Sequence, residues 1–173
     1  MKNRLQAAND IVMTNPVFAK RIVDYFKPTG SCLDPCKGDG AFANAMPGCD
    51  WCEITEGKNF LIHQGNYNWI ITNPPWSSKA YRAIAQHAFD LADNVVFLIR
   101  LDLAIGTYAR QRDYQSRDHG LKEVIICKYE DAGFTQKGFA LAVLHWQKIF
   151  NKSKHARFPI RTTWTDWTRT SAR

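Results

Sequence analysis

The sequence contains no hydrophobic run long enough to cross a membrane. A membrane-spanning helix takes about 20 consecutive apolar residues, and no stretch of the 173 residues approaches that length. The N-terminal segment from Met1 to Gln6 also lacks the apolar core of a secretion signal. We therefore expect a cytoplasmic protein with no membrane partner, in which the five cysteines stay reduced.

Cysteine is too sparse to give a strong metal signature. Cys32, Cys36, Cys49 and Cys52 have a spacing that superficially resembles a zinc site. Cys32 and Cys36, however, bracket Asp34 in a predicted strand and turn, so zinc ligands there would have to fold away from the sheet. Small buried thiols are the commoner explanation, and we expect no metal site.

Neither an internal repeat nor a low-complexity linker divides the chain. Its length is enough for one domain with a sizeable core, and 45% of its residues are hydrophobic. Predicted strands alternate with helices, which is typical of a doubly wound α/β fold with a mostly parallel sheet. We expect seven strands at 31–34, 50–54, 59–61, 67–72, 94–100, 122–127 and 139–146, and helices at 15–27, 41–45 and 78–91. Residues 103–116 are expected to form a helix or a lid.

Acidic residues are scarce at the end of the chain. The whole sequence has 16 Asp and Glu against 23 Lys and Arg, for a formal net charge of +7. Residues 151–173 contain six basic residues and a single acidic residue, Asp166, and Phe158, Trp164 and Trp167 lie among them. Basic residues interleaved with aromatics suit contact with phosphates and bases, although the tryptophans would also fit a segment that packs back on the domain. We therefore expect one domain at 1–150 and a basic, aromatic tail at 151–173.

Two adjacent prolines form the most informative turn of the sequence. The predicted strand 67–72 ends in Asn73-Pro74-Pro75-Trp76, called the N-P-P-W turn below. Proline lacks the N–H that a β-ladder needs, and a residue before proline is pushed toward an extended conformation. The turn therefore holds an amide, the Pro74 carbonyl and the Trp76 ring in a fixed relation. Such groups could grip a planar ring bearing an amine; the alternative is a surface turn with a buried tryptophan.

A glycine turn follows the first predicted strand. In the segment LDPCKGDGAF, from Leu33 to Phe42, Gly38 and Gly40 permit a positive φ and a close approach of ligand to backbone. A helix begins directly after them and presents unpaired N–H groups. Asp34 is placed to take a cationic or hydroxyl group of a ligand.

An acidic residue then follows at a spacing typical of nucleotide-binding folds. Glu53 ends the next predicted strand, about twenty residues after Asp34, where an acid typically hydrogen-bonds ribose hydroxyls. In doubly wound sheets ligands bind beyond the carboxyl ends of the strands. Asp34, Glu53 and Asn73 all fall at such ends, so the motifs together predict one ligand site.

With these motifs the chain resembles a known family, the class I S-adenosylmethionine-dependent methyltransferases, and most of all the DNA adenine-N6 methyltransferases. The family's cofactor motif is similar to residues 34–42, and its catalytic motif, (D/N/S)-P-P-(Y/W/F), matches the N-P-P-W turn. Residues 9–19 resemble its N-terminal T-P segment, except that Asn15 separates Thr14 from Pro16. The order of the three motifs is that of the gamma-type enzymes.

The resemblance implies a Rossmann-like methyltransferase fold, S-adenosylmethionine as cofactor, and methyl transfer to the N6 amine of adenine in DNA. Asn73 and the Pro74 carbonyl would accept hydrogen bonds from the amine, Pro75 would stiffen the turn, and Trp76 would stack on the base. Relatives often have Asp where this chain has Asn59. The residues expected to bind the cofactor are Thr14, Asp34, Pro35, Gly38, Gly40, Phe42, Glu53, Asn59, Phe60 and Asn73.

Substrate contacts are expected from two further segments. Phe139 or Phe134 would supply a second aromatic for the base, and the basic side chains of 103–119 are Arg110, Arg112 and Arg117. The gamma-type enzymes usually carry a separate target-recognition domain, and this chain has only 25 or so residues after its last predicted strand. Specificity would then come from the segment 103–119, from the tail, or from a partner, as a homodimer or a separate specificity subunit.

Three other functions stay open. RNA adenine methyltransferases use similar N-P-P-(F/Y/W) turns; the missing recognition domain favours them, whereas the N-terminal segment favours DNA. Protein glutamine-N5 methyltransferases mostly have tyrosine at the last motif position, so Trp76 and the basic tail argue against them. A catalytically silent nucleic-acid-binding subunit is disfavoured because the motifs are intact.

Overall fold

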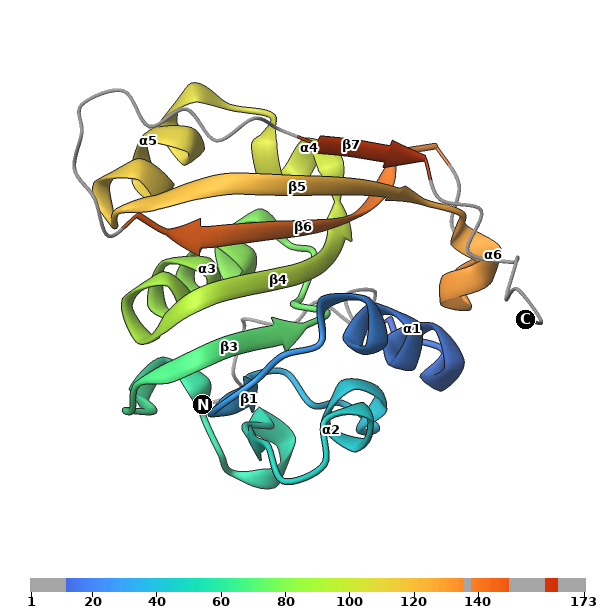
Figure 1. The fold of residues 1–173 in the computed structure, drawn as a ribbon, viewed down its shortest axis with the longest axis vertical. Helices are drawn as coiled ribbons and strands as arrows, with labels where there is room; N and C mark the ends of the chain where they lie inside the picture. Colours follow the sequence, from blue (N-terminus) through green and yellow to red (C-terminus); the bar gives the residue numbers. More distant parts are fainter. Residues whose placement is uncertain (1–11, 136–137, 150–160, 165–173) are drawn as a thin grey trace.

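A computed structural model describes residues 12–135 and 138–149, and the backbone of 161–164. Its centre is a seven-stranded sheet in the order β2-β1-β3-β4-β6-β5-β7 (Figure 1). The strands are β1 (Cys32–Asp34), β2 (Asp50–Trp51), β3 (Tyr67–Thr72), β4 (Ala92–Arg100), β5 (His119–Cys127), β6 (Leu141–Lys148) and β7 (Arg161–Trp164). Only β6 runs against its neighbours in this sheet. The expectation of a mostly parallel α/β fold is confirmed.

Helices cover both faces of the sheet. One face carries α1 (Pro16–Phe26), α2 (Ala41–Ala45) and α6 (Tyr129–Ala132), and the other carries α3 (Ser78–Leu91), α4 (Leu101–Ile105) and α5 (Tyr108–Ser116). No described helix is both long and apolar enough to span a membrane.

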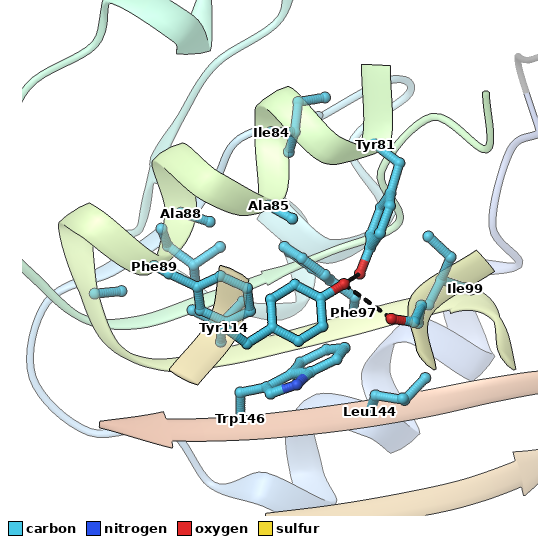
Figure 2. Packing of buried hydrophobic residues seen from close by; sticks show 14 of the residues in the cluster. Tyr81, Ile84, Ala85, Ala88, Phe89, Phe97, Ile99, Tyr114, Leu144 and Trp146 are labelled. Atoms are coloured by element: carbon cyan, nitrogen blue, oxygen red, sulfur yellow. Dashed lines mark hydrogen bonds between the residues drawn. The ribbon is translucent and has the colours of Figure 1, made fainter. Parts of the chain in front are cut away.

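The central strand β4 shows why both faces need a cover. Val95, Phe97 and Ile99 pack on the α3 side, and Val96 and Leu98 pack on the α1 side. Successive side chains of a strand point to opposite faces, so a continuous apolar run requires helices on both. On the α3 side the core contains a group of packed aromatic rings, among them Phe89, Phe97 and Trp146 (Figure 2).

Helix α1 begins directly after Asn15, the residue that separates Thr14 from Pro16 in the T-P segment. The Asn15 side chain accepts a hydrogen bond from the Val17 N–H at 2.8 Å, and Pro16 occupies the first helical position. Both residues suit these places, because asparagine is a good N-cap and proline needs no N–H there. The insertion of Asn15 therefore gives the helix its cap.

The expected third strand at 59–61 is wrong. Phe60–Ile62 form a 3-10 turn, η2, and the Asn59 side chain accepts from the Leu61 N–H at 3.0 Å. Such local side-chain bonds compete with a ladder. A second 3-10 turn, η1 (Ile54–Glu56), shortens the strand expected at 50–54.

The seventh strand comes from the segment that we expected to be a tail. β7 pairs in parallel with β5 through the backbone of 161–164. The rest of 150–173, with Phe158, Asp166 and Trp167, lies outside the described residues.

Residues 103–116 form parts of two helices, and Gly106 separates them. The Gly106 N–H donates to the Asp102 carbonyl at 2.9 Å. A Cβ at Gly106 would lie 2.2 Å from that carbonyl oxygen, so any side chain there would force the turn open. The chain thereby leaves α4 and enters α5 within two residues.

Candidate functional site

The carboxyl edge of the sheet brings the three sequence motifs together. Asp34 ends β1, Asn73 directly follows β3, and Glu53 lies two residues beyond β2. Since these strands are parallel, their ends meet at one edge. A cavity of about 250 Å³ opens there between the N-terminal segment, the glycine turn and the N-P-P-W turn.

A second cavity of about 240 Å³ adjoins the first. Both share Cys36, Glu53, Thr55 and Pro75 in their walls. The second is closed on its far side by residues of η2 and α3, including Phe60. The two cavities therefore form one elongated recess with Glu53 at its middle.

The recess contains most of the residues expected to bind a cofactor. Those lining the first cavity are Thr14, Gly38, Phe42, Glu53 and Asn73, and those lining the second are Pro35, Glu53, Asn59 and Phe60. Asp34 and Gly40 line neither cavity. Gly40 instead precedes α2 with a φ of 93°.

Gly38 keeps the floor of the first cavity open. Its φ is 53°, and a Cβ there would approach the Met13 sulfur to 3.1 Å. Its N–H donates to Glu53 Oε2 at 2.9 Å. A glycine is therefore needed both for the backbone conformation and for the close passage of residues 12–14 above it.

Glu53 is held by hydrogen bonds on both of its oxygens. Oε1 accepts from the N–H and the hydroxyl of Thr55, at 3.0 and 2.7 Å, while Oε2 accepts from Gly38. Partial burial alone would raise the Glu53 pKa, but these hydrogen bonds outweigh it and lower the pKa. Glu53 is thus a fixed carboxylate, and Oε2 keeps room to accept one more hydrogen bond from a ligand.

Asp34 lies beneath the recess and is completely buried. Its Oδ1 accepts from the Thr72 hydroxyl at 2.7 Å and from the Cys36 N–H at 3.3 Å. Oδ2 has no partner among the described residues. Burial raises the Asp34 pKa to about 6. The hydrogen bond from Thr72 to Asp34 also holds the start of the N-P-P-W turn in place. The sequence alone did not indicate this contact.

The Asn73 amide is oriented by three hydrogen bonds. Its Nδ2 donates to the Val12 carbonyl at 2.8 Å and to the Thr14 hydroxyl at 3.1 Å. Its Oδ1 accepts from the Trp76 indole N–H at 3.0 Å. A flipped amide would place its oxygen against the Val12 carbonyl and its N–H groups against the indole N–H. The carbonyl oxygen is therefore fixed and retains one site for a further donor.

Two phenylalanines meet the Trp76 ring edge to face. The ring centroids of Phe134 and Phe139 lie 5.3 and 5.4 Å from that of Trp76, at interplanar angles of 83° and 89°. Phe134 is buried, whereas Phe139 is partly exposed. The Arg100 guanidinium lies 4.5 Å from the Phe139 ring centre. These side chains form a corner beside the first cavity.

The three arginines expected to touch substrate are separated. Arg110 donates to the Ser78 hydroxyl at 2.9 Å, close to the N-P-P-W turn, and Arg112 is exposed on α5. Arg117 instead pairs with Asp90 at 3.0 Å. Asp90 lies near the other end of α3, about 18 Å along the helix axis from Ser78. Arg117 is therefore not part of this edge.

Sequence reasoning missed three side chains of this region. Met13 lines the first cavity, Thr72 holds Asp34, and Arg100 stands over Phe139. Arg100 carried a usable signal, because a charged residue ends the otherwise apolar strand β4 at the carboxyl edge. Within the described residues no group of three or more His, Cys, Asp or Glu could hold a metal ion.

Comparison with known proteins identifies the fold. No family model matches the sequence, and no curated protein matches it. A Listeria monocytogenes protein, proposed to be a class I S-adenosylmethionine-dependent methyltransferase, matches in structure with a TM-score of 0.61 at 9% identity, over 91% of this chain and 67% of that chain.

Two further solved structures have the same fold. One is the M protein of the type I restriction enzyme EcoKI, with a TM-score of 0.60 at 12% identity, over 80% of this chain and 44% of that chain. The other is a Pyrococcus horikoshii protein proposed to be an RNA methyltransferase, with a TM-score of 0.59 at 12% identity, over 78% of this chain and 84% of that chain. This chain thus spans less than half of the EcoKI protein. Together with the sheet topology, these matches show that the chain has the class I methyltransferase fold.

Proposed function

We propose that this protein transfers a methyl group from S-adenosylmethionine to the N6 amine of adenine in DNA. The observation that carries the proposal is the position of the Asn73 amide. It lines the same cavity as Gly38 and Glu53, and its carbonyl oxygen is held by the Trp76 indole. An acceptor for an amine and a site suited to a nucleotide-like cofactor therefore lie side by side.

The residues of the recess fit the cofactor. Glu53 Oε2, with one hydrogen bond from Gly38, can accept from a ribose hydroxyl. The second cavity, with Phe60 and Ile84 in its wall, suits the adenine of the cofactor, and Asn59 stands beside it. The first cavity, under Met13 and Thr14, would take the methionine end. When bound, S-adenosylmethionine would supply a methyl group already activated by its sulfonium centre.

The N-P-P-W turn then has two tasks toward the target base. Asn73 Oδ1 and the Pro74 carbonyl would accept hydrogen bonds from the adenine NH2, and this alignment directs the nitrogen toward the methyl group. The amide of Asn73 is a poor base, so the surplus proton leaves to water after transfer.

The aromatic corner would hold the base. Flipping an adenine out of a duplex costs a few kcal/mol, and stacking on an aromatic side chain returns about 1–3 kcal/mol. We assign the stacking contact to Trp76, while the partly exposed Phe139, whose ring is perpendicular to that of Trp76, would contact the edge of the base. Phe134, which is buried, would support the Trp76 ring from behind.

The test is to replace Asn73 by alanine. Asn73→Ala should lower methyl transfer by about 100-fold or more, because an oriented acceptor is lost at the reacting amine. Cofactor affinity, measured by calorimetry, should stay close to that of the parent. Asn66→Ala, in an exposed loop, is the matched control. Lost cofactor affinity with unchanged turnover in Asn73→Ala would contradict the assigned role.

An RNA adenine methyltransferase is the second candidate, because one structural neighbour is a proposed RNA methyltransferase. Labelled cofactor offered in parallel to duplex DNA, single-stranded DNA, RNA and protein separates the two. If only RNA is labelled, the substrate is RNA and not DNA. If only protein is labelled, neither nucleic acid is the substrate.

A further inference from the structure

Helix α5 presents a polar face with no protein cover among the described residues. Of its nine residues only Tyr114 is buried. Tyr108 is 78% exposed, more than any other large hydrophobic side chain of the described residues. Arg112 is exposed as well, and it lies on the same side of the helix as Tyr108 because residues four apart are neighbours. An aromatic ring and a cation thus stand together in solvent.

The first turn of α5 lies beside the N-P-P-W turn and is held there by Arg110, which points to the opposite side of the helix from Tyr108 and Arg112 because residues two apart do not share a face. Arg110 donates to the Ser78 hydroxyl at 2.9 Å and to the Asp102 carbonyl at 3.3 Å. Ser78 is the second residue after Trp76, and Lys79 follows it as an exposed side chain. The start of α5 is therefore joined directly to the start of α3 at the edge of the site.

The charge of this surface is not cancelled locally. Arg82 and Arg100 have carboxylate partners, Asp113 and Asp102. By contrast, the exposed side chains of Lys79 and Arg112 form no ion pair with the described residues. A surface with unpaired cations next to an exposed aromatic ring is complementary to a polyanion that carries bases.

We propose that the first turn of α3 and the outer face of α5 bind the DNA strand next to the target adenine. Lys79 and Arg112 contact its phosphates and Tyr108 stacks on a neighbouring base, while Arg110 holds the first turn of α5 against Ser78. The proposal rests on the function proposed above and adds the surface that holds the polymer.

The test is direct binding of a fluorescent single-stranded oligodeoxynucleotide by the full chain, followed by anisotropy at several salt concentrations. Arg112→Ala should raise Kd about five- to tenfold and reduce the salt slope by about 0.7, the value for one phosphate contact on a single strand. Tyr108→Ala should raise Kd by a similar factor without changing the slope, because stacking releases no counterions.

Lys20→Ala is the control, since it removes one exposed positive charge from α1, on the other face of the sheet. It should bind like the parent. Equal weakening by Lys20→Ala and Arg112→Ala, or no DNA binding by the parent, would overturn the proposal. Tighter binding of an RNA of the same sequence, with the same variant sensitivity, would overturn the assignment to DNA.

The outcomes separate this surface from the methyltransferase function. If Arg112→Ala and Tyr108→Ala weaken DNA binding but the parent transfers no methyl group to DNA, the surface stands and the proposed function fails. If the parent methylates DNA while both variants bind it normally, the function stands and the surface fails.

Discussion

At the scale of single residues, the orientation of the Asn73 amide is the feature with the clearest chemical consequence. The Thr14 hydroxyl accepts a hydrogen bond from this amide, so in the proposed reaction Thr14 would be a positioning residue as well as part of the cavity wall. Thr14→Val should slow single-turnover methyl transfer about tenfold, because the amide loses one of the bonds that fix its oxygen.

The conservative change provides the control. Thr14→Ser keeps the hydroxyl and should restore most of the rate, while cofactor affinity, measured by calorimetry, should differ little between the two variants. Because valine keeps the methyl group of Thr14 and loses only the hydroxyl, a Thr14→Val rate equal to that of the parent would contradict the role of this hydrogen bond.

At the scale of helices and strands, two tyrosines join α3, α4 and α5 (Figure 2). The Tyr81 and Tyr114 hydroxyl oxygens are 2.8 Å apart, and Tyr114 donates to the Ala104 carbonyl at 2.9 Å. Since Tyr114 uses its proton on Ala104, Tyr81 must donate to Tyr114. Burial raises the pKa of Tyr114 to about 12, so the pair stays neutral.

We therefore expect unequal costs for removing the two hydroxyls. Tyr114→Phe leaves both the Tyr81 hydroxyl and the Ala104 carbonyl without their partner, and should lower the free energy of unfolding by about 2–3 kcal/mol. Tyr81→Phe keeps the bond to Ala104 and should cost about 1 kcal/mol. Urea unfolding measures both, and equal losses would contradict this order of donors.

The sequence predicted those elements whose signal is local. The proline pair fixed the end of β3, and the apolar run from Val95 to Ile99 identified the central strand. The prediction of a strand at 59–61 was wrong, because the Asn59 side chain accepts a hydrogen bond from the Leu61 N–H and so favours a turn over a short strand. Sequence reasoning also missed the contact of Asp34 with Thr72, since a pairing across 38 positions leaves no trace in spacing or periodicity.

At the scale of the whole molecule, buried histidines govern the response to acid. Burial lowers the pKa of His145 to about 3 and lowers that of His119 as well. Below about pH 6.5 the unfolded chain binds protons at these residues that the folded chain does not. Their contribution to stability is therefore lost as the pH falls. Asp34, with its pKa raised to about 6, acts in the opposite sense between about pH 4 and 6.

The destabilising effect of protonating the two histidines exceeds the stabilising effect of Asp34. We therefore expect the free energy of unfolding to fall by on the order of 1 kcal/mol from pH 7 to pH 5. His145→Gln should retain a hydrogen-bond donor toward the Asn94 side chain, which now lies 3.1 Å from the imidazole. Urea titrations at both pH values should show a smaller difference for this variant. An unchanged difference would assign the effect to other groups.

The direction of β6 allows the second half of the chain to contribute residues to the same edge of the sheet as the first half. Because β6 runs against its neighbours, the loop with Phe139 returns to the edge where the earlier strands end. The methyl donor and the amine acceptors would be held by residues up to Ile84, whereas Phe139, Tyr108 and Arg112, which would contact the rest of the target, come after position 99. Replacing the second half of the chain would then change the substrate specificity and leave the cofactor site as it is.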